Sequence, residues 1–183
     1  MAAYYLAVDI GASSGRHILG HMENGKMVLE EIYRFENGMV KKDGELCWEF
    51  DRLFQEIKNG LKKCKEIGKI PVSMGVDTWG VDFVLMDKDD KVLGNTVGYR
   101  DHRNEGMDED VYKTISLEDL YARTGIQKAI FNTVYQLMAV KTKHPEYLEQ
   151  AETMLHVPDY VHYLLTGKKT CEYTEATTGQ LVN

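Results

Sequence analysis

The stretch around which the rest of the sequence is organised is residues 4–16, Tyr4-Tyr5-Leu6-Ala7-Val8-Asp9-Ile10-Gly11-Ala12-Ser13-Ser14-Gly15-Arg16. An apolar run ends at the carboxylate of Asp9, a turn of small residues follows, and a second apolar run begins at His17. Glycines at positions 11 and 15 let the backbone turn sharply and direct N–H groups into one concavity, which suits phosphate oxygens. Asp9 could hold a magnesium ion, directly or through water. Taken alone, the stretch also fits an ordinary hairpin turn with a solvated Asp, and short motifs often match by chance.

Composition limits the classes of protein to consider. The 183 residues fit one domain, and 43% hydrophobic with 28% charged residues is typical of a soluble globular protein. The net charge of -7, without a Lys/Arg block, argues against nucleic-acid and membrane-surface partners but allows small phosphorylated ligands. No apolar run approaches the ~20 residues of a membrane span. The scattered Cys47, Cys64 and Cys171 indicate reduced thiols, so we expect a cytoplasmic protein.

The first half of the chain predicts a sheet interrupted by a helix. Strands are expected at 4–10, 15–22 and 26–35, with an Asn-Gly turn before the third, and at 45–50. A helix begins with Asp51 as its cap, presents Leu53, Phe54, Ile57, Leu61 and Cys64 on one face, and stops at Gly68. The run 72–76 reads as a buried strand, which would return parallel to the first.

This order of three antiparallel strands, a helix and a parallel strand resembles the ribonuclease H-like fold of actin, heat-shock chaperones and sugar kinases. We therefore predict an α/β protein with a mixed sheet, in which three antiparallel strands precede parallel strands and helices flank the sheet.

The second half predicts mostly helices. A strand over 81–86 is followed by helices at 108–115, from the cap Ser116 to Gly125, and from a capping box of Thr133 with Gln136 to about Lys143. A buried strand at 154–157 precedes a helix that begins at Pro158 and ends at Gly167. The acidic cluster Asp87, Asp89 and Asp90 lacks the spacing of an EF-hand and reads as a solvated turn, and His156 and His162 lack the spacing of a metal site.

Six segments, in order, resemble those of the FGGY carbohydrate kinases. They are 9–16 (DIGASSGR), 75–85 (GVDTWGVDFVL), 99–103 (YRDHR), 131–137 (FNTVYQL), 158–167 (with PDY and LLTG) and 172–183 (EYTEATTGQLVN). The resemblance extends from end to end, and it implies that residues 1–183 form an incomplete N-terminal kinase domain without the C-terminal nucleotide domain.

Within that family, the sugar-site segment at 75–85, together with Gln136 and Ala139, is similar to kinases that act on L-rhamnulose. The resemblance implies ATP-dependent phosphorylation of L-rhamnulose to L-rhamnulose 1-phosphate, with ATP and Mg²⁺ bound and little activity in this chain alone. Fuculokinases share Gly80-Val81-Asp82 and remain an alternative, as does a non-catalytic module that binds sugar or phosphate.

The resemblance also assigns roles to residues. The backbone of Ala12, Ser13, Ser14 and Gly15 and the guanidinium of Arg16 would hold the ATP phosphates, with Asp9 at the metal. Gly80 would let the sugar lie against the backbone, Trp79 would stack on the sugar or belong to the core, and Asp82 would bind sugar hydroxyls or cap a turn. An internal ion pair is expected to hold the 99–103 loop. The catalytic base would be an Asp beyond residue 183 rather than Asp77.

Overall fold

The computed structural model describes residues 3–182 and divides into two compact units. The first comprises the chain up to Gly38 together with Glu49–Trp79, and the second comprises Met39–Trp48 together with the chain from Gly80 onward. The expectation of one domain over residues 1–183 stays a prediction.

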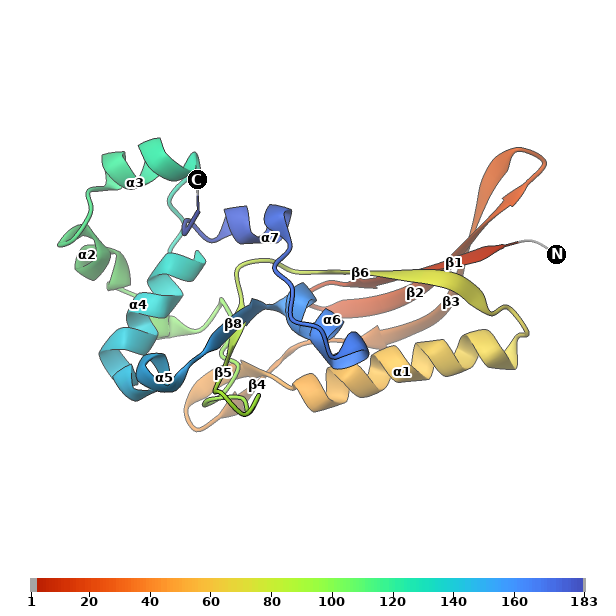
Figure 1. The fold of residues 1–183 in the computed structure, drawn as a ribbon, viewed down its shortest axis with the longest axis horizontal. Coiled ribbons are helices and arrows are strands. Elements are labelled where there is room, and N and C mark those ends of the chain that lie inside the picture. The colour runs from red at the N-terminus through yellow and green to blue at the C-terminus, as the bar shows by residue number, and fades with distance from the viewer. Residues whose placement is uncertain (1–2, 183) are drawn as a thin grey trace. The chain divides into compact units, whose positions relative to one another are not determined.

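The first unit is a four-stranded sheet with one helix (Figure 1). It contains β1 (Tyr4–Ile10), β2 (Ser14–Glu23), β3 (Lys26–Glu36), α1 (Phe50–Glu66) and β6 (Pro71–Thr78). The strand order is β3-β2-β1-β6, with β1 antiparallel to β2 and parallel to β6, so that Asp9 lies beside Asp77 in register. The predicted order of three antiparallel strands, a helix and a parallel strand is confirmed. The expectation that the strand over 72–76 is buried is wrong, because β6 is the edge strand of this sheet and none of its residues is buried.

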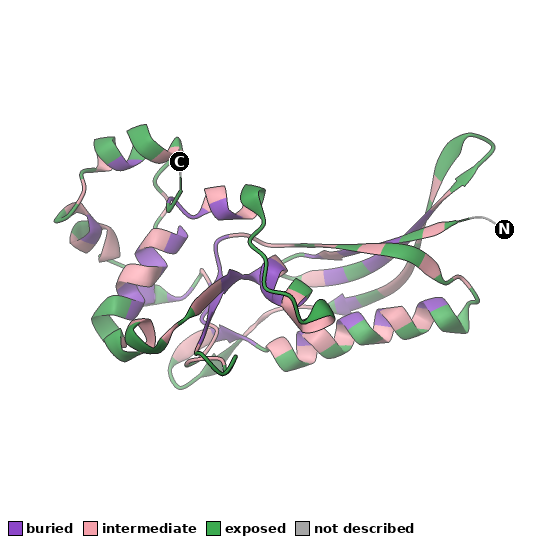
Figure 2. Cartoon of the chain, in the orientation of Figure 1, coloured by how far each residue is buried: buried purple, intermediate pink, exposed green. Residues whose placement is uncertain are grey.

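One face of this sheet packs against α1. Alternate residues of β1 (Leu6, Val8 and Ile10) are buried, and buried positions recur at helical spacing along α1 (Figure 2). His17 of β2 is fully buried, with its Nε2 3.2 Å from the carbonyl of Ile57 in α1. The helix begins at Phe50, and its N-cap is Glu49 without a side-chain hydrogen bond. The predicted cap, Asp51, is therefore wrong: this residue lies within the first turn.

The second unit combines two short antiparallel strand pairs with short helices. The pairs are β4 (Met39–Lys42) with β5 (Glu45–Trp48), and β7 (Phe83–Met86) with β8 (Thr153–His156). The helices are η1 (His102–Asn104), α2 (Met107–Tyr112), α3 (Leu117–Thr124), α4 (Thr133–Lys143), α5 (Pro145–Gln150), α6 (Val157–Thr166) and α7 (Tyr173–Thr178). The strand β4 was not predicted, since it has no apolar alternation that would mark it.

The helix α4 carries a core cluster on each of two sides. One is built on Phe83, Leu85 and Val140, and the other on Val111, Leu120 and Tyr135. Because apolar residues lie on both sides, α4 shows only a weak amphipathic pattern in its sequence, and this pattern does not indicate its orientation.

Helix ends in this unit follow the predictions only in part. Ser116 caps α3 by accepting a hydrogen bond from the Asp119 amide at 3.0 Å, as predicted. Gly167 ends α6 in the left-handed conformation, also as predicted. The predicted capping box on α4 is wrong, because the N-cap is Asn132 and the Thr133 and Gln136 side chains bond to groups outside the helix.

The longest helix in the described part of the chain, α1, carries lysines along its exposed side. Within residues 3–182, no helix combines the length and the apolar character that crossing a membrane requires.

Candidate functional site

In the turn between β1 and β2 of the first unit, three carbonyls accept hydrogen bonds and two amides have no protein acceptor among the described residues. The Gly11 amide donates to the Ser14 carbonyl at 2.8 Å, and Asn37 binds the carbonyls of Gly11 (2.8 Å, side chain) and Ser13 (3.0 Å, backbone). Among the described residues, the amides of Ala12 and Ser13 donate to no protein acceptor. The turn therefore presents unused donors, as a phosphate-binding turn requires.

The predicted metal ligand and the predicted phosphate-binding cation lie side by side. Asp9 and Arg16 are cross-strand partners, and Arg16 Nε and Nη2 lie 2.8 and 2.7 Å from Asp9 Oδ2. Both side chains are partly exposed, and Asp9 Oδ1 has no hydrogen-bond partner within residues 3–182. The same part of the chain holds no group of three or more His, Cys, Asp or Glu suited to a metal. Asp9 would thus be a single protein ligand, which suits Mg²⁺ because this ion keeps several waters and binds phosphates.

Gly15 has a packing reason that is separate from any ligand. A Cβ at this position would lie 2.1 Å from Cζ of Phe35 on β3. The ring therefore occupies the place of a side chain, and the glycine is required by the sheet itself.

In the second unit, the turn from Gly80 to Asp82 is held in a strained conformation. Val81 has φ of 68°, which is rare for a β-branched residue and persists only when its surroundings fix it. The Val81 amide donates to Glu175 Oε1 at 2.9 Å. Its carbonyl accepts from Thr133 Oγ1 at 2.7 Å and from Gln136 Nε2 at 3.2 Å.

Asp82 supports the same turn from inside the unit. Its side chain has no exposed surface, and it accepts hydrogen bonds from Trp48 Nε1 at 2.6 Å, the Tyr99 amide at 3.1 Å and Gln136 Nε2 at 2.9 Å. Of the two roles that the sequence allowed, this geometry corresponds to holding the turn.

The 99–103 loop is connected to Asp82 through Gln136. Asp101 accepts from the amides of Arg103 and Leu46, both at 2.7 Å, while the Arg103 guanidinium reaches Gln136 Oε1 at 3.5 Å. Of the ion pair expected inside this loop, the structure shows a contact between His102 Nδ1 and Asp101 Oδ2 at 3.8 Å, which is an ion pair only when His102 is protonated. Backbone amides are the shorter contacts of Asp101. Burial lowers the pKa of Arg103, whose side chain keeps its charge because nearby carboxylates attract it.

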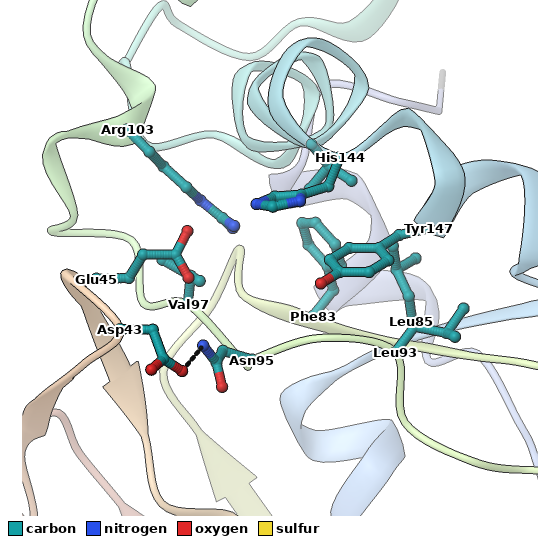
Figure 3. Close-up of a pocket in the computed structure, with 11 residues that line it drawn as sticks. Asp43, Glu45, Phe83, Leu85, Leu93, Asn95, Val97, Arg103, His144 and Tyr147 are labelled. Atoms are coloured by element: carbon teal, nitrogen blue, oxygen red, sulfur yellow. Dashed lines mark hydrogen bonds between the residues drawn. The ribbon is translucent and has the colours of Figure 1, made fainter.

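Arg103 also borders a cavity of about 270 Å³ (Figure 3). Figure 3 shows its guanidinium and the His144 ring pointing toward the same space, with Glu45 across from them and Phe83 and Tyr147 on the apolar side. A cavity of this size has room for several water molecules. It therefore gives the buried guanidinium access to hydrogen-bonding partners that the protein does not supply.

The predicted sugar-binding residues are divided between the two units. Trp79 is half-buried at the end of the first unit, and Gly80 opens the second. A Cβ on Gly80 would meet the Glu175 oxygens at 3.5 Å and Thr178 Oγ1 at 3.7 Å, which are ordinary contacts. The position beside Gly80 would thus accept a methyl group without a clash, and polar atoms border it.

Glu175 is the functional candidate that sequence reasoning missed. Desolvation raises its pKa to about 7, against the opposing hydrogen bond from Val81. Neighbouring carboxylates raise it further: Asp159, Glu172 and Asp82. Its only sequence signal was its place in the segment 172–183, whose last residue, Asn183, lies outside the described residues.

Comparisons with known proteins show which family the chain resembles. Residues 4–183 match the family model described as the FGGY family of carbohydrate kinases, N-terminal domain. A protein of Halalkalibacterium halodurans named rhamnulokinase is 58% identical over 180 residues, which is 98% of this chain and 38% of that protein. Another of that name, from Oceanobacillus iheyensis, is 53% identical over 97% of this chain and 38% of its own length.

The fold has close counterparts among solved structures. The ligand-bound xylulose kinase of Lactobacillus acidophilus superposes with a TM-score of 0.83 at 20% identity, covering 99% of this chain and 37% of that one. The expectation of a sugar-kinase type of α/β fold is thereby confirmed. The chain spans less than two-fifths of the length of these relatives. On the match of nearly all its residues, the chain belongs to the FGGY family of carbohydrate kinases and corresponds to their N-terminal domain.

Proposed function

We propose that this chain is part of an ATP-dependent kinase that phosphorylates L-rhamnulose to L-rhamnulose 1-phosphate. The observation that carries the proposal is identity of 58% and 53%, over nearly the whole chain, to two proteins named rhamnulokinase. Because the chain covers 38% of each, the activity is proposed for the full-length protein. The segment beyond residue 183 would supply the catalytic Asp and the nucleotide domain.

The proposed ATP-binding element is the turn Ala12–Arg16. The open amides of Ala12 and Ser13 would donate to phosphate oxygens, and the Arg16 guanidinium, freed from Asp9, would bind a phosphate bidentately. Asp9 offers carboxylate oxygens of the kind that Mg²⁺ prefers, with Oδ1 already open. The metal, when bound, would neutralise charge on the phosphates. Arg16 would then exchange one anionic partner for another.

The proposed sugar-binding element is the turn around Gly80. Without a side chain, Gly80 would let a ketose lie against the backbone, and Trp79 would offer its ring to a sugar face. Asp82 would contribute by fixing the turn, since its carboxylate is enclosed by Trp48, Tyr99 and Gln136. The chain's own residues would bind and orient the sugar, and proton removal would belong to the later Asp.

The test is an assay of the purified full-length protein with ATP, Mg²⁺ and a panel of ketoses that includes L-rhamnulose, L-fuculose and L-xylulose. We expect L-rhamnulose to give the highest kcat/KM. A higher kcat/KM for L-fuculose would show that L-fuculose, and not L-rhamnulose, is the substrate. Failure to phosphorylate any ketose would favour a non-catalytic sugar-binding module.

A further inference from the structure

The Glu175 carboxylate stands out because it combines a structural contact with an unused oxygen. Its Oε1 accepts the Val81 amide at 2.9 Å, whereas Oε2 has no hydrogen-bond partner among the described residues. The residue is half-buried, and Oε2 is not among the buried polar atoms, so this oxygen reaches the surface. One oxygen is thus engaged and the other is available.

The available oxygen faces Gly80. Both carboxylate oxygens lie 3.5 Å from the position that a Cβ on Gly80 would take, so the carboxylate borders the space left by the missing side chain. Thr178 Oγ1 borders the same space at 3.7 Å, and it donates to the Glu175 carbonyl at 2.7 Å. A ligand that lies against Gly80 would therefore meet an acceptor and not an apolar wall.

We propose that Glu175 is a substrate-binding and specificity residue, which fixes the Gly80–Val81 turn with Oε1 and accepts a hydrogen bond from a ketose hydroxyl with Oε2. This inference rests on the proposed sugar kinase function. A carboxylate in this place favours a neutral polyhydroxylated ligand, which brings donors, over an anionic sugar, which it repels.

The surroundings of the carboxylate support a role at neutral pH. The charged groups near it are acidic and come from three segments: Asp82 before β7, Asp159 of α6 and Glu172 before α7. Together with desolvation they raise the pKa of Glu175 to about 7. Sugar binding through the ionised acceptor should therefore strengthen as pH rises through this value, because the protonated carboxyl loses acceptor strength.

The experiment compares full-length wild-type protein with E175Q and with the control E118Q, which removes an exposed carboxylate from the first turn of α3. In E175Q the amide oxygen can still accept the Val81 amide, but the second position becomes a donor. We expect KM for L-rhamnulose to rise by about 10-fold, with kcat and the KM for ATP changed less than about twofold. E118Q should match wild type.

The pH profile separates a sugar contact from a merely structural role. Wild type should show a rise in kcat/KM for the ketose near pH 7 that E175Q lacks. An unchanged KM with the same pH step in E175Q would overturn the inference.

A protein without turnover would contradict the proposed function, and calorimetric titration with L-rhamnulose would then test Glu175. Binding weakened about 10-fold in E175Q would support the contact, and equal binding or none would exclude it.

Discussion

At the scale of single residues, Val81 shows how this protein maintains a conformation that its own chemistry disfavours. A left-handed valine costs on the order of 1–3 kcal/mol, and it persists only when its neighbours hold it. Here Glu175 holds the amide, and Thr133 and Gln136 hold the carbonyl. The turn beside Gly80 is therefore set in advance of any ligand.

The Thr133 hydroxyl offers a direct test of this support. T133V keeps the shape and removes the donor to the Val81 carbonyl, so we expect a loss of about 1–2 kcal/mol of unfolding free energy. T142V is the control, because Thr142 lies on the same helix and its hydroxyl bonds the Met138 carbonyl at an exposed position. Urea denaturation should show little change in T142V, and equal effects would contradict the idea.

Arg16 tests the proposed phosphate-binding turn. R16A should raise the KM for ATP of the full-length protein by about 10-fold, since a charge-assisted contact is lost. R34A is the matched control, because Arg34 is the cross-strand partner of Arg16 and pairs with Glu31 on the same sheet. A similar KM for both variants would exclude a specific role for Arg16.

At the scale of elements, the contact between α1 and β2 depends on a glycine inside a helix. Gly60 is buried, and a Cβ there would lie 2.3 Å from the His17 ring. Glycine lowers the helix propensity at this position, but it lets the helix approach the sheet closely.

Gly60 predicts that a Gly to Ala substitution in a helix lowers the unfolding free energy. Gly to Ala in a helix normally stabilises by about 1 kcal/mol, but G60A should destabilise by about 1–3 kcal/mol because the methyl group overpacks the His17 ring. K62A, at an exposed position of the same helix, should be near neutral. Thermal unfolding measures both, and stabilisation by G60A would contradict the packing.

Local sequence signals predicted elements better than their ends. The Asn-Gly turn before β3, the Ser116 cap and Gly167 worked because each acts through its own backbone neighbours. The Thr133–Gln136 capping box failed because those side chains found partners more than 50 residues away. A cap motif indicates which side-chain hydrogen bonds are possible, and tertiary packing decides which of them form.

At the scale of the whole molecule, each unit contains a buried histidine. Burial lowers the pKa of His17 in the first unit and of His156 in the second below 6.5. A histidine that is neutral in the folded state binds a proton more readily when unfolded, so stability is full above 6.5 and is lost as pH falls below it.

The loss of folding stability at acid pH should be measured in the E175Q variant. The raised pKa of Glu175 has the opposite sign, because the folded protein binds its proton more tightly and gains stability as pH falls from about 7 toward 4.5. With that group removed, the urea midpoint should fall between about pH 7.5 and 5.5. Adding H156Q should reduce the fall, because it removes one of the two buried histidines. A flat profile would contradict the buried, neutral histidines.

The sequence by itself determined the strands with alternating burial, the helix between β3 and β6, and membership of the family, because these depend on residues close together in the chain. It also marked Asp9, the 11–15 turn and Gly80 as the places to look. Only the tertiary structure decided that Asp82 is enclosed, that Val81 is left-handed and that Glu175 binds its amide across 94 residues of sequence. Such pairings leave no periodic pattern, since the energy that selects them comes from burial and hydrogen bonding between distant segments.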